Sequence, residues 1–341
     1  MRQRLFRFVR IVLVGLFILI LAGAVYEQIG QRLDRRRLPQ IGRSVDIGNR
    51  KLNIFCSGEG NPTVIFDSGA REPGYRWAAI QAEVAKNTQA CCFDRAGYGW
   101  SDPGPYPHAS EETAKDLHDL LRRAGLPPPY ILVGHSLDGL NVRVYAGMYL
   151  NEVAGIVFVD SAHEDEPKRA PAFMLGRSAP RILWRPIDML VEGARAAGVI
   201  RLFTPAVRLS DDVGQRTPQQ ILNALELQPK TIATLGDPST GVLSYEQAQR
   251  VGTLGDKPVI VLTRGKIPNP AQPTEQDRQY AAYMQVWMHE IQPKIARLST
   301  RGKQIIVENS GHEIPDEAPE AVVSAVLQVL AESSKGSMLT H

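Results

Sequence analysis

Short runs of β-branched and apolar residues alternate with segments of helical periodicity from residue 41 onward in this chain. This alternation is typical of a sheet that carries helices on its faces. Several runs are apolar throughout, as expected for parallel strands covered on both faces. We therefore predict an α/β fold with a mostly parallel central sheet and helices on both of its faces. The predicted strands are residues 50–57, 63–67, 90–94, 131–134, 155–160, 259–263 and 304–308, and the predicted helices are residues 111–124, 137–149, 274–298 and 319–332.

The segment between residues 161 and 255 lacks strand-like runs of comparable quality. Amphipathic pieces such as residues 185–197 and 218–227 stand there instead, and their periodicity indicates helices. We predict that residues 162–255 form a helical cap inserted between two strands. Its apolar side chains would suit a hydrophobic part of a substrate, although packing explains most of them equally well. These side chains are Phe173, Met174, Leu183, Trp184, Met189 and Leu190.

The N-terminus carries Arg2, Arg4, Arg7 and Arg10, followed by an uncharged apolar run over residues 11–26. Such a run is short for a membrane-spanning helix and long for the core of a signal peptide. We predict a retained membrane anchor over residues 1–36, with a cleaved signal segment as the alternative. The basic start favours a catalytic domain outside the cytoplasm, and a reversed anchor with a cytoplasmic domain is the competing interpretation.

The remaining composition is that of a globular protein. The chain has 341 residues, of which 43% are hydrophobic and 22% charged, so that it can bury a large core. Its net charge of +3 lacks the basic excess of nucleic-acid-binding domains. We expect a small-molecule substrate and no nucleic acid partner.

A serine follows directly after a predicted strand and precedes a predicted helix. The segment reads Ile131-Leu-Val-Gly-His-Ser136, and Leu137 opens the helical pattern. A sharp strand-to-helix turn exposes a serine hydroxyl above the sheet and points a helix N-terminus toward developing negative charge. Ser136 is therefore the predicted nucleophile.

Four motifs resemble those of the α/β-hydrolase family in the same order, over nearly the whole chain after residue 41. They are Asp67-Ser-Gly-Ala70, Asp94-Arg-Ala-Gly-Tyr-Gly-Trp-Ser101, Gly134-His-Ser136 and Ser310-Gly-His312. The resemblance implies hydrolysis of an ester, thioester or amide of a small, partly hydrophobic substrate. Ser136 would attack the carbonyl, and His312 would take up and later return a proton. Backbone N–H groups of Ala70 and Leu137 would form the oxyanion hole.

The family places its third catalytic member, an acid, after the sixth or the seventh strand of the core sheet. Residues 259–263, the seventh-strand candidate, are followed by no carboxylate before residue 275. Asp160 ends the preceding strand at the carboxyl edge of the sheet, where the other members converge. We predict Asp160 as the acid, with the capping of a turn as the competing role. Glu164, Asp165 and Asp277 are the alternative acids, and His163 is expected on the surface.

Asp138 departs from the family pattern, because it stands where Gly-x-Ser-x-Gly has its second glycine. Two unit charges ~4 Å apart interact by roughly 4 kcal/mol at a surface-like dielectric, so a carboxylate aimed at the oxyanion would oppose catalysis. We expect Asp138 to point away, in the first turn of the helix, where the helix dipole favours an acid. Gly139 would supply the small residue one step later. The alternative is a non-catalytic ligand-binding protein.

Cofactor and metal motifs are missing from the sequence, so that neither a cofactor nor a metal is expected. Cys56, Cys91 and Cys92 are too few for a disulfide scaffold and are expected as buried thiols. The implied fold sets their strands side by side, so Cys56 could pair with Cys91 or Cys92 if the domain is exported. The predicted organisation is an anchor (1–36), the first part of the core (37–161), a cap (162–255), the second part of the core (256–335) and a tail (336–341).

Overall fold

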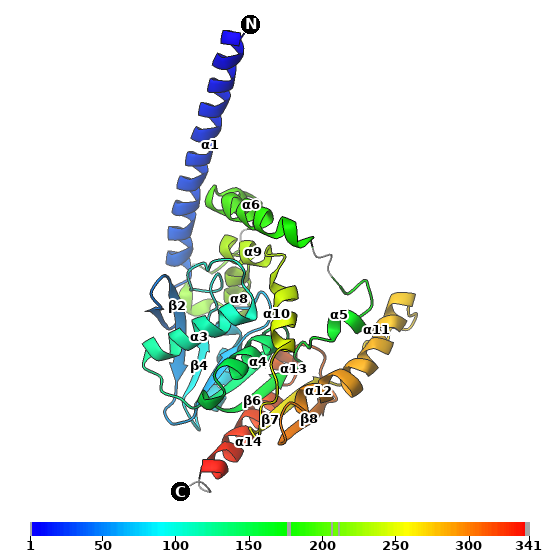
Figure 1. Ribbon diagram of the computed structural model, residues 1–341. Coiled ribbons are helices and arrows are strands. Elements are labelled where there is room, and N and C mark those ends of the chain that lie inside the picture. The colour runs from blue at the N-terminus through cyan, green and yellow to red at the C-terminus, as the bar shows by residue number, and fades with distance from the viewer. Residues whose placement is uncertain (1, 176–178, 206, 211, 338–341) are drawn as a thin grey trace.

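The computed structural model describes residues 2–175, 179–205, 207–210 and 212–337 and is built around one sheet (Figure 1). Its strand order is β1-β2-β4-β3-β5-β6-β7-β8. The β1–β2 and β2–β4 pairs are antiparallel, and every later pair is parallel, which confirms the predicted mostly parallel sheet. The strands are β1 (Arg43–Asp46), β2 (Lys51–Ser57), β3 (Thr63–Asp67), β4 (Ala90–Phe93), β5 (Tyr130–His135), β6 (Val153–Val159), β7 (Val259–Arg264) and β8 (Gly302–Val307).

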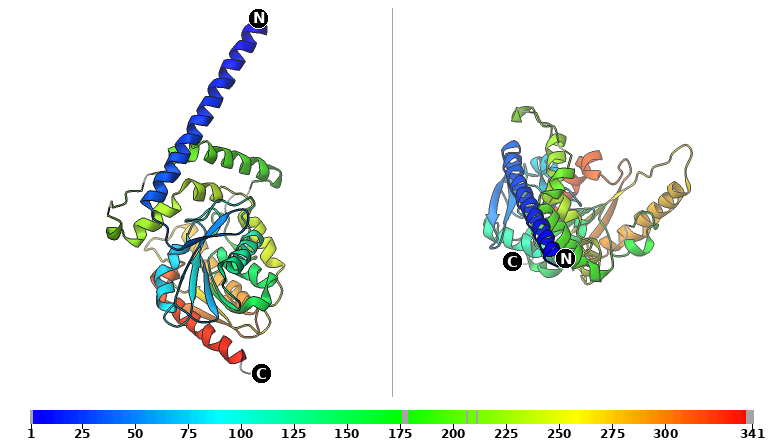
Figure 2. Two further views of the ribbon diagram at one scale, coloured as in Figure 1. Left: turned by 90° about the vertical axis from the view of Figure 1, so that its left-hand side faces the viewer. Right: turned by 90° about the horizontal axis from the view of Figure 1, so that it is seen from above.

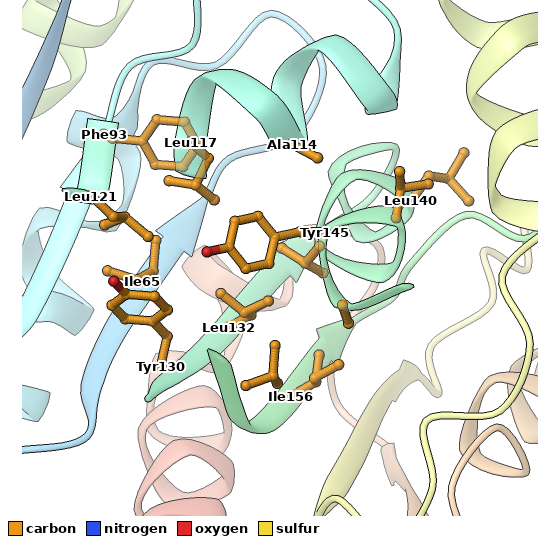
Figure 3. Packing of buried hydrophobic residues seen from close by; sticks show 14 of the residues in the cluster. Ile65, Phe93, Ala114, Leu117, Leu121, Tyr130, Leu132, Leu140, Tyr145 and Ile156 are labelled. Atoms are coloured by element: carbon orange, nitrogen blue, oxygen red, sulfur yellow. The ribbon is translucent and has the colours of Figure 1, made fainter. Parts of the chain in front are cut away.

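Two hydrophobic clusters cover the two faces of the sheet, because successive strand side chains point to opposite sides. Ile65 and Leu132 face the side of α3 (Ser110–Ala124), α4 (Asp138–Met148), α10 (Thr240–Gln249) and α12 (Gln292–Ala296). Figure 3 shows this packing, with Tyr145 of α4 above Leu132. Val64 and Val133 face α2 (Ala78–Val84), α13 (Ile314–Glu317) and α14 (Pro319–Ser337). Strands buried on both faces explain why their sequences are apolar throughout.

Some element boundaries differ from the prediction. The predicted helix over residues 274–298 is divided into α11 (Glu275–Val286), a π-helical turn (Trp287–Ile291) and α12. Helix α14 runs past its predicted end to Ser337, and residues 338–341 of the predicted tail lie outside the described residues. Strand β1 was not predicted, because its four residues are mostly polar.

The chain between β6 and β7 forms helices in its described parts. These are α5 (Glu166–Arg169), α6 (Trp184–Ala196), α7 (Val199–Phe203), α8 (Pro218–Glu226), α9 (Pro229–Leu235) and α10, with short 3₁₀ turns at Arg181–Leu183 and Val213–Gln215. We call this segment the insertion. In Figure 1 it lies on the side of the sheet from which the N-terminal helix departs.

Helix α1 (Arg2–Arg37) is one continuous helix that projects from the rest of the molecule (Figure 2). It is long and apolar enough to cross a membrane, a criterion that a signal sequence near the N-terminus also meets. Its C-terminal half is not free, because Glu27 is buried and forms an ion pair with Arg201 of α7. The helix is thus consistent with membrane association and is joined to the insertion.

Candidate active site

Ser136 lies in the turn between β5 and α4, with the backbone in the left-handed region at φ 56°. A non-glycine residue in this region is strained, as is often seen at functional sites. The turn needs glycine on both sides: a Cβ atom on Gly134 would lie 2.8 Å from the Asp138 carbonyl oxygen, and one on Gly139 would overlap the Ser161 side chain. Gly139 therefore supplies the close approach that the pattern lacks at position 138.

The side chains of Ser136, His312 and Asp160 form one hydrogen-bonded chain. His312 Nε2 lies 2.9 Å from Ser136 Oγ, and His312 Nδ1 lies 2.5 Å from Asp160 Oδ2. The three residues come from segments that follow β5, β8 and β6, and the carboxyl ends of these parallel strands meet at one edge of the sheet. The arrangement can move a proton from a hydroxyl to an imidazole that a carboxylate orients.

Asp160 is completely buried and held from several sides. Its Oδ1 accepts hydrogen bonds from Trp287 Nε1 at 2.9 Å and from the Arg264 backbone N–H at 3.1 Å, and its Oδ2 accepts from Arg264 Nε at 2.6 Å. Burial by itself would raise the pKa of Asp160, but the hydrogen bond from His312 and the charge of Arg264 outweigh it and hold the pKa well below its usual range. Asp160 is therefore a carboxylate across the physiological pH range.

The other acids that the sequence left open are engaged elsewhere. Glu164 pairs with Arg143, and Asp165 pairs with Lys294 at 2.5 Å. Asp277 accepts from Thr274 in the capping box at the start of α11. His163, expected on the surface, is buried instead, and its Nδ1 accepts the Asp165 backbone N–H.

Ala70 and Leu137 lie beside the turn that carries Ser136 and line a common cavity. Within the described parts of the chain, the backbone N–H groups of both residues donate no hydrogen bond. The loop that carries Ala70 is fixed, because the Gly69 carbonyl accepts from Arg95 Nη2 at 2.9 Å and the Gly69 N–H donates to Glu72 Oε2 at 3.0 Å. An oxyanion hole needs backbone donors of this kind, so both residues remain its candidates.

Asp138 is buried in the first turn of α4, and its carboxylate forms an ion pair with the Arg95 guanidinium. Asn141 Nδ2 donates to Asp138 Oδ1 at 2.9 Å and to Asp67 Oδ2 at 3.2 Å. Asp67 Oδ1 lies 3.9 Å from Arg95 Nε, and burial raises the pKa of Asp67 to about 6. We call Asp67, Arg95 and Asp138 the buried charge cluster. Arg95 thus neutralises the Asp138 carboxylate, which would oppose catalysis if it pointed at the oxyanion.

The motif that begins at Asp94 builds the loop that carries Arg95. Asp94 is buried, and its carboxylate accepts backbone N–H groups from Gly74 at 2.7 Å and from Trp100 at 2.8 Å. Gly99 has φ 49° and comes so close to the Asp94 carboxylate that a Cβ atom would overlap it. The motif thus fixes the conformation of this loop, which places Arg95 beside Asp138.

A second polar link joins the nucleophile turn to the histidine loop. His135 is buried, and its Nε2 donates to the His312 carbonyl oxygen at 3.0 Å, while its Nδ1 lies 3.6 Å from Glu72 Oε2. Burial disfavours the charged form of His135, but the Glu72 carboxylate more than offsets this and raises the pKa above its ordinary value. This link restrains the backbone on both sides of the Ser136–His312 contact.

Glu72, His135 and Glu313 also place potential metal-ligand atoms within 4.8 Å of one another. Arg76 occupies the same cluster, at 2.6 Å from Glu313 and 3.6 Å from Glu72. Its guanidinium already supplies the positive charge that these carboxylates need. The cluster is therefore best described as an ion-pair network.

The cavity beside the Ser136 turn is lined by both polar and apolar residues. Arg95, Tyr98 and His108 line it together with Ala70 and Leu137. The sequence suggested six apolar residues of the insertion as substrate contacts. None of them is among the described residues that line this cavity, and Leu183, Met189 and Leu190 are exposed to solvent. Amphipathic periodicity identifies the helices of an insertion, but it cannot say whether an apolar face turns toward a cavity.

Cys56 and Cys91 form a disulfide between the adjacent strands β2 and β4, whereas Cys92 is a free, buried thiol. The expectation of three buried thiols therefore applies to Cys92 alone. Alternating strand side chains explain the difference, since Cys91 and Cys92 point to opposite faces of the sheet.

Arg264, Arg95 and Glu72 were not among the predicted site residues. A signal for Arg264 was present, because it directly follows a predicted strand at the edge where the acid was sought. Arg95 lies within the motif that begins at Asp94, and an arginine that such a motif buries needs an acidic partner. Glu72 follows the oxyanion loop with no comparable signal.

The chain is similar in sequence to known proteins. The model of the alpha/beta hydrolase family matches residues 64–325. An uncharacterized Bacillus subtilis protein, YbdG, is 28% identical over 164 residues, which cover 46% of this chain and 50% of that protein. The match thus spans about half the length of that relative.

Solved structures show the same fold. A thermophilic esterase from Thermogutta terrifontis superposes with a TM-score of 0.54 at 20% identity, over 85% of this chain and 98% of the esterase. The epoxide hydrolase CorEH superposes with a TM-score of 0.54 at 18% identity, over 85% of this chain and 98% of that enzyme. At this identity the likeness concerns the fold alone, so the chemistry must be argued from the residues of this chain.

Proposed function

The chain belongs to the alpha/beta hydrolase family, and from this premise we propose that it is a serine hydrolase acting on an ester, thioester or amide of a small, partly hydrophobic substrate. One observation carries the proposal. His312 lies 2.9 Å from Ser136 Oγ through one ring nitrogen and 2.5 Å from Asp160 through the other. A serine at this position favours acyl chemistry over epoxide opening, for which relatives with this fold use an aspartate nucleophile.

The proposed reaction begins when Ser136 Oγ adds to the substrate carbonyl carbon and His312 Nε2 accepts the hydroxyl proton. The Nδ1–H of the resulting imidazolium donates to Asp160, which holds the ring in place. The backbone N–H groups of Ala70 and Leu137 stabilise the oxyanion, each contributing on the order of 10²- to 10³-fold in rate. His312 Nε2 then protonates the leaving group, and water hydrolyses the acyl-enzyme with His312 again acting as base.

The competing proposal, a ligand-binding protein without turnover, depended on Asp138. The Asp138–Arg95 ion pair weakens it, because the carboxylate is neutralised by a neighbouring cation. The insertion remains the proposed cap, with residues 162–255 as its proposed bounds.

Covalent labelling with a fluorophosphonate probe tests the proposed function on the full chain in detergent. We expect labelling of the native protein, none in Ser136→Ala, and a rate lower by up to about 10⁴-fold in Asp160→Asn, because the imidazole loses its orienting carboxylate. Ser161→Ala is the matched control, since its hydroxyl lies next to Asp160 but bonds only to the Ala162 carbonyl among the described residues. Labelling that persists in Ser136→Ala would reject Ser136 as nucleophile.

We also propose that the catalytic domain lies outside the cytoplasm, since disulfides persist in oxidising compartments. The Cys56–Cys91 disulfide supports this placement. Trapping free thiols with an alkylating reagent during denaturing cell lysis tests it, because the reagent then reaches buried thiols and should still miss Cys56 and Cys91. Alkylation of both residues before any reduction would place the domain in the cytoplasm.

A further inference from the structure

The insertion exposes large apolar side chains beside helix α1. Ile182 is 83% exposed, Met189 77%, Leu190 73%, Leu202 67% and Phe203 84%. We call these five residues the apolar face. Single exposed apolar residues are common on proteins, but several on neighbouring elements often mark an interaction site.

The periodicity of α6 places Met189 and Leu190 on the side of this helix that faces away from the protein. Asp188 is buried, and Val191 packs against the turn that follows α9, where a Cβ atom on Gly236 would lie 3.2 Å from it. Met189 and Leu190 project from the other side, together with Pro186 and Gly193 at the spacing of a single helix face. Arg185 is the one charged residue among the exposed positions of α6, whereas a helix that faces water normally turns several polar residues outward.

Helix α1 meets the insertion at the end of its own apolar run. The backbones of Gly23 and Ala197 touch, since a Cβ atom on Gly23 would overlap the Ala197 carbonyl oxygen. Gly23 lies within the uncharged run that ends at Tyr26. The loop between α6 and α7 therefore reaches the level at which α1 is still apolar.

The first acidic residues after this run are neutralised by the insertion. Arg201 of α7 lies 2.7 Å from Glu27 and 2.8 Å from Asp34. The two ion pairs fix α7 to α1 at the height where the apolar run gives way to charged residues. The 16 residues from Ile11 to Tyr26 rise about 24 Å, most of the hydrocarbon thickness of a bilayer.

We infer that the apolar face of α6 and α7 rests in the interface of the bilayer that α1 enters. A membrane around the apolar part of α1 has its boundary near Tyr26, at the level of the loop between α6 and α7. Figures 1 and 2 show α6 as the part of the molecule nearest the projecting half of α1. Arg185 is exposed on the same helix and can meet an anionic headgroup.

Other occupants of this face are less well supported. None of the five residues of the apolar face lines the cavity beside the Ser136 turn, so the apolar face is not part of that cavity. A second copy of the chain would have to cover the face while leaving room for lipid around α1. The inference does not depend on Ser136 being the nucleophile, so that the two proposals can fail separately.

Lipid quenching of site-specific fluorophores tests this docking on the full chain in vesicles of phosphatidylcholine and phosphatidylglycerol. Met189→Cys and Phe203→Cys would each carry an environment-sensitive label. The native cysteines should not react, since Cys56 and Cys91 are joined and Cys92 is buried. Ala331→Cys is the control, on the exposed side of α14 at the opposite end of the molecule (Figure 1).

We expect labels at 189 and 203 to lose roughly half of their emission when the vesicles contain lipids with a shallow nitroxide, because an interfacial helix face lies about 5–10 Å within the headgroup and acyl boundary. The label at 331 should keep its emission. Equal quenching at all three positions would overturn the inference. A blue-shifted emission at 189 and 203 without lipid quenching would also overturn it, since protein would then cover the face.

Discussion

The substitution Arg95→Met removes the only cation of the buried charge cluster and tests whether that cation makes Asp138 tolerable. Arg95 and Asp138 side chains are 9% and 2% exposed, so little water can replace the lost partner. Removing one member of a buried ion pair costs about 3–5 kcal/mol, because the other charge stays buried without compensation. Here Asp67 loses its cation as well, and we expect a loss of unfolding free energy near the upper end of this range at pH 7.

The complementary substitution should cost less. Asp138→Asn leaves Arg95 with Asp67 at 3.9 Å and with the Gly69 carbonyl at 2.9 Å. The guanidinium therefore keeps partners, and a loss of about 1–2 kcal/mol is expected, as for a weakened buried hydrogen bond. The double variant Arg95→Met with Asp138→Asn should lose less than the sum of the two, with a coupling of roughly 0.5–3 kcal/mol.

Urea unfolding of the full chain in detergent micelles measures these differences, followed by the fluorescence of buried Trp77 and Trp287. A second series at pH 5 should show a smaller cost for Arg95→Met, because Asp67, whose pKa is about 6, is then mostly protonated. Fluorophosphonate labelling of Asp138→Asn should remain close to that of the native protein. A cost below about 1 kcal/mol for Arg95→Met, or strict additivity in the double variant, would refute the proposed role of the cluster.

Three further outcomes follow from the same structure. Burial raises the pKa of Asp67 from 3.8 to about 6, so the protonated side chain stabilises the fold fully below pH 3.8, and this contribution is lost as the pH rises through about 6. The unfolding free energy should therefore fall by about 2–3 kcal/mol between pH 4 and 6, and Asp67→Asn should abolish this fall in urea titrations. An unchanged pH dependence of the variant would contradict this. Because the Glu72 carboxylate outweighs the effect of burial and raises the pKa of His135, the pair stabilises the fold at low pH and loses this effect as the pH rises through that pKa. Glu72→Gln should weaken the pH dependence of the unfolding free energy above pH 6.5, and an unchanged dependence would show that the pair has no effect. The Cys56–Cys91 disulfide closes a loop of sequence separation 35, so replacing both by serine should cost about 3–4 kcal/mol in the same unfolding assay under non-reducing conditions, and equal midpoints would show that the bond adds nothing.

Local patterns were sufficient for most of the secondary structure. The strand over residues 63–67 was predicted with the bounds that the structure gives it, and the helix after Ser136 is one residue shorter at each end than predicted. Parallel strands and helices that pack on them leave continuous or periodic apolar patterns, which can be read without a partner. β1 and the division of residues 274–298 left no such pattern, since both depend on what the segment packs against.

The order of strands along the chain also led to the proposed catalytic residues. Ser136, Asp160 and His312 each follow a strand, and parallel strands carry their carboxyl ends to the same edge of the sheet. Their positions after these strands were therefore enough to predict that the three residues lie close together. The distances of 2.9 and 2.5 Å that join them belong to the folded chain.

The tertiary structure alone decided how the charges around this site are compensated and where the apolar face of the insertion points. Arg264 reaches Asp160 across 104 residues of chain, and Arg201 reaches Glu27 across 174. Such pairs obey no short-range period, because their geometry depends on how distant elements pack. The sequence by itself determined which strands are buried on both faces and which of them end together. The side-chain contacts that pair Asp138 with Arg95 beside the Ser136 turn, and that tie α1 to the insertion, exist only once the sheet and its helices are assembled.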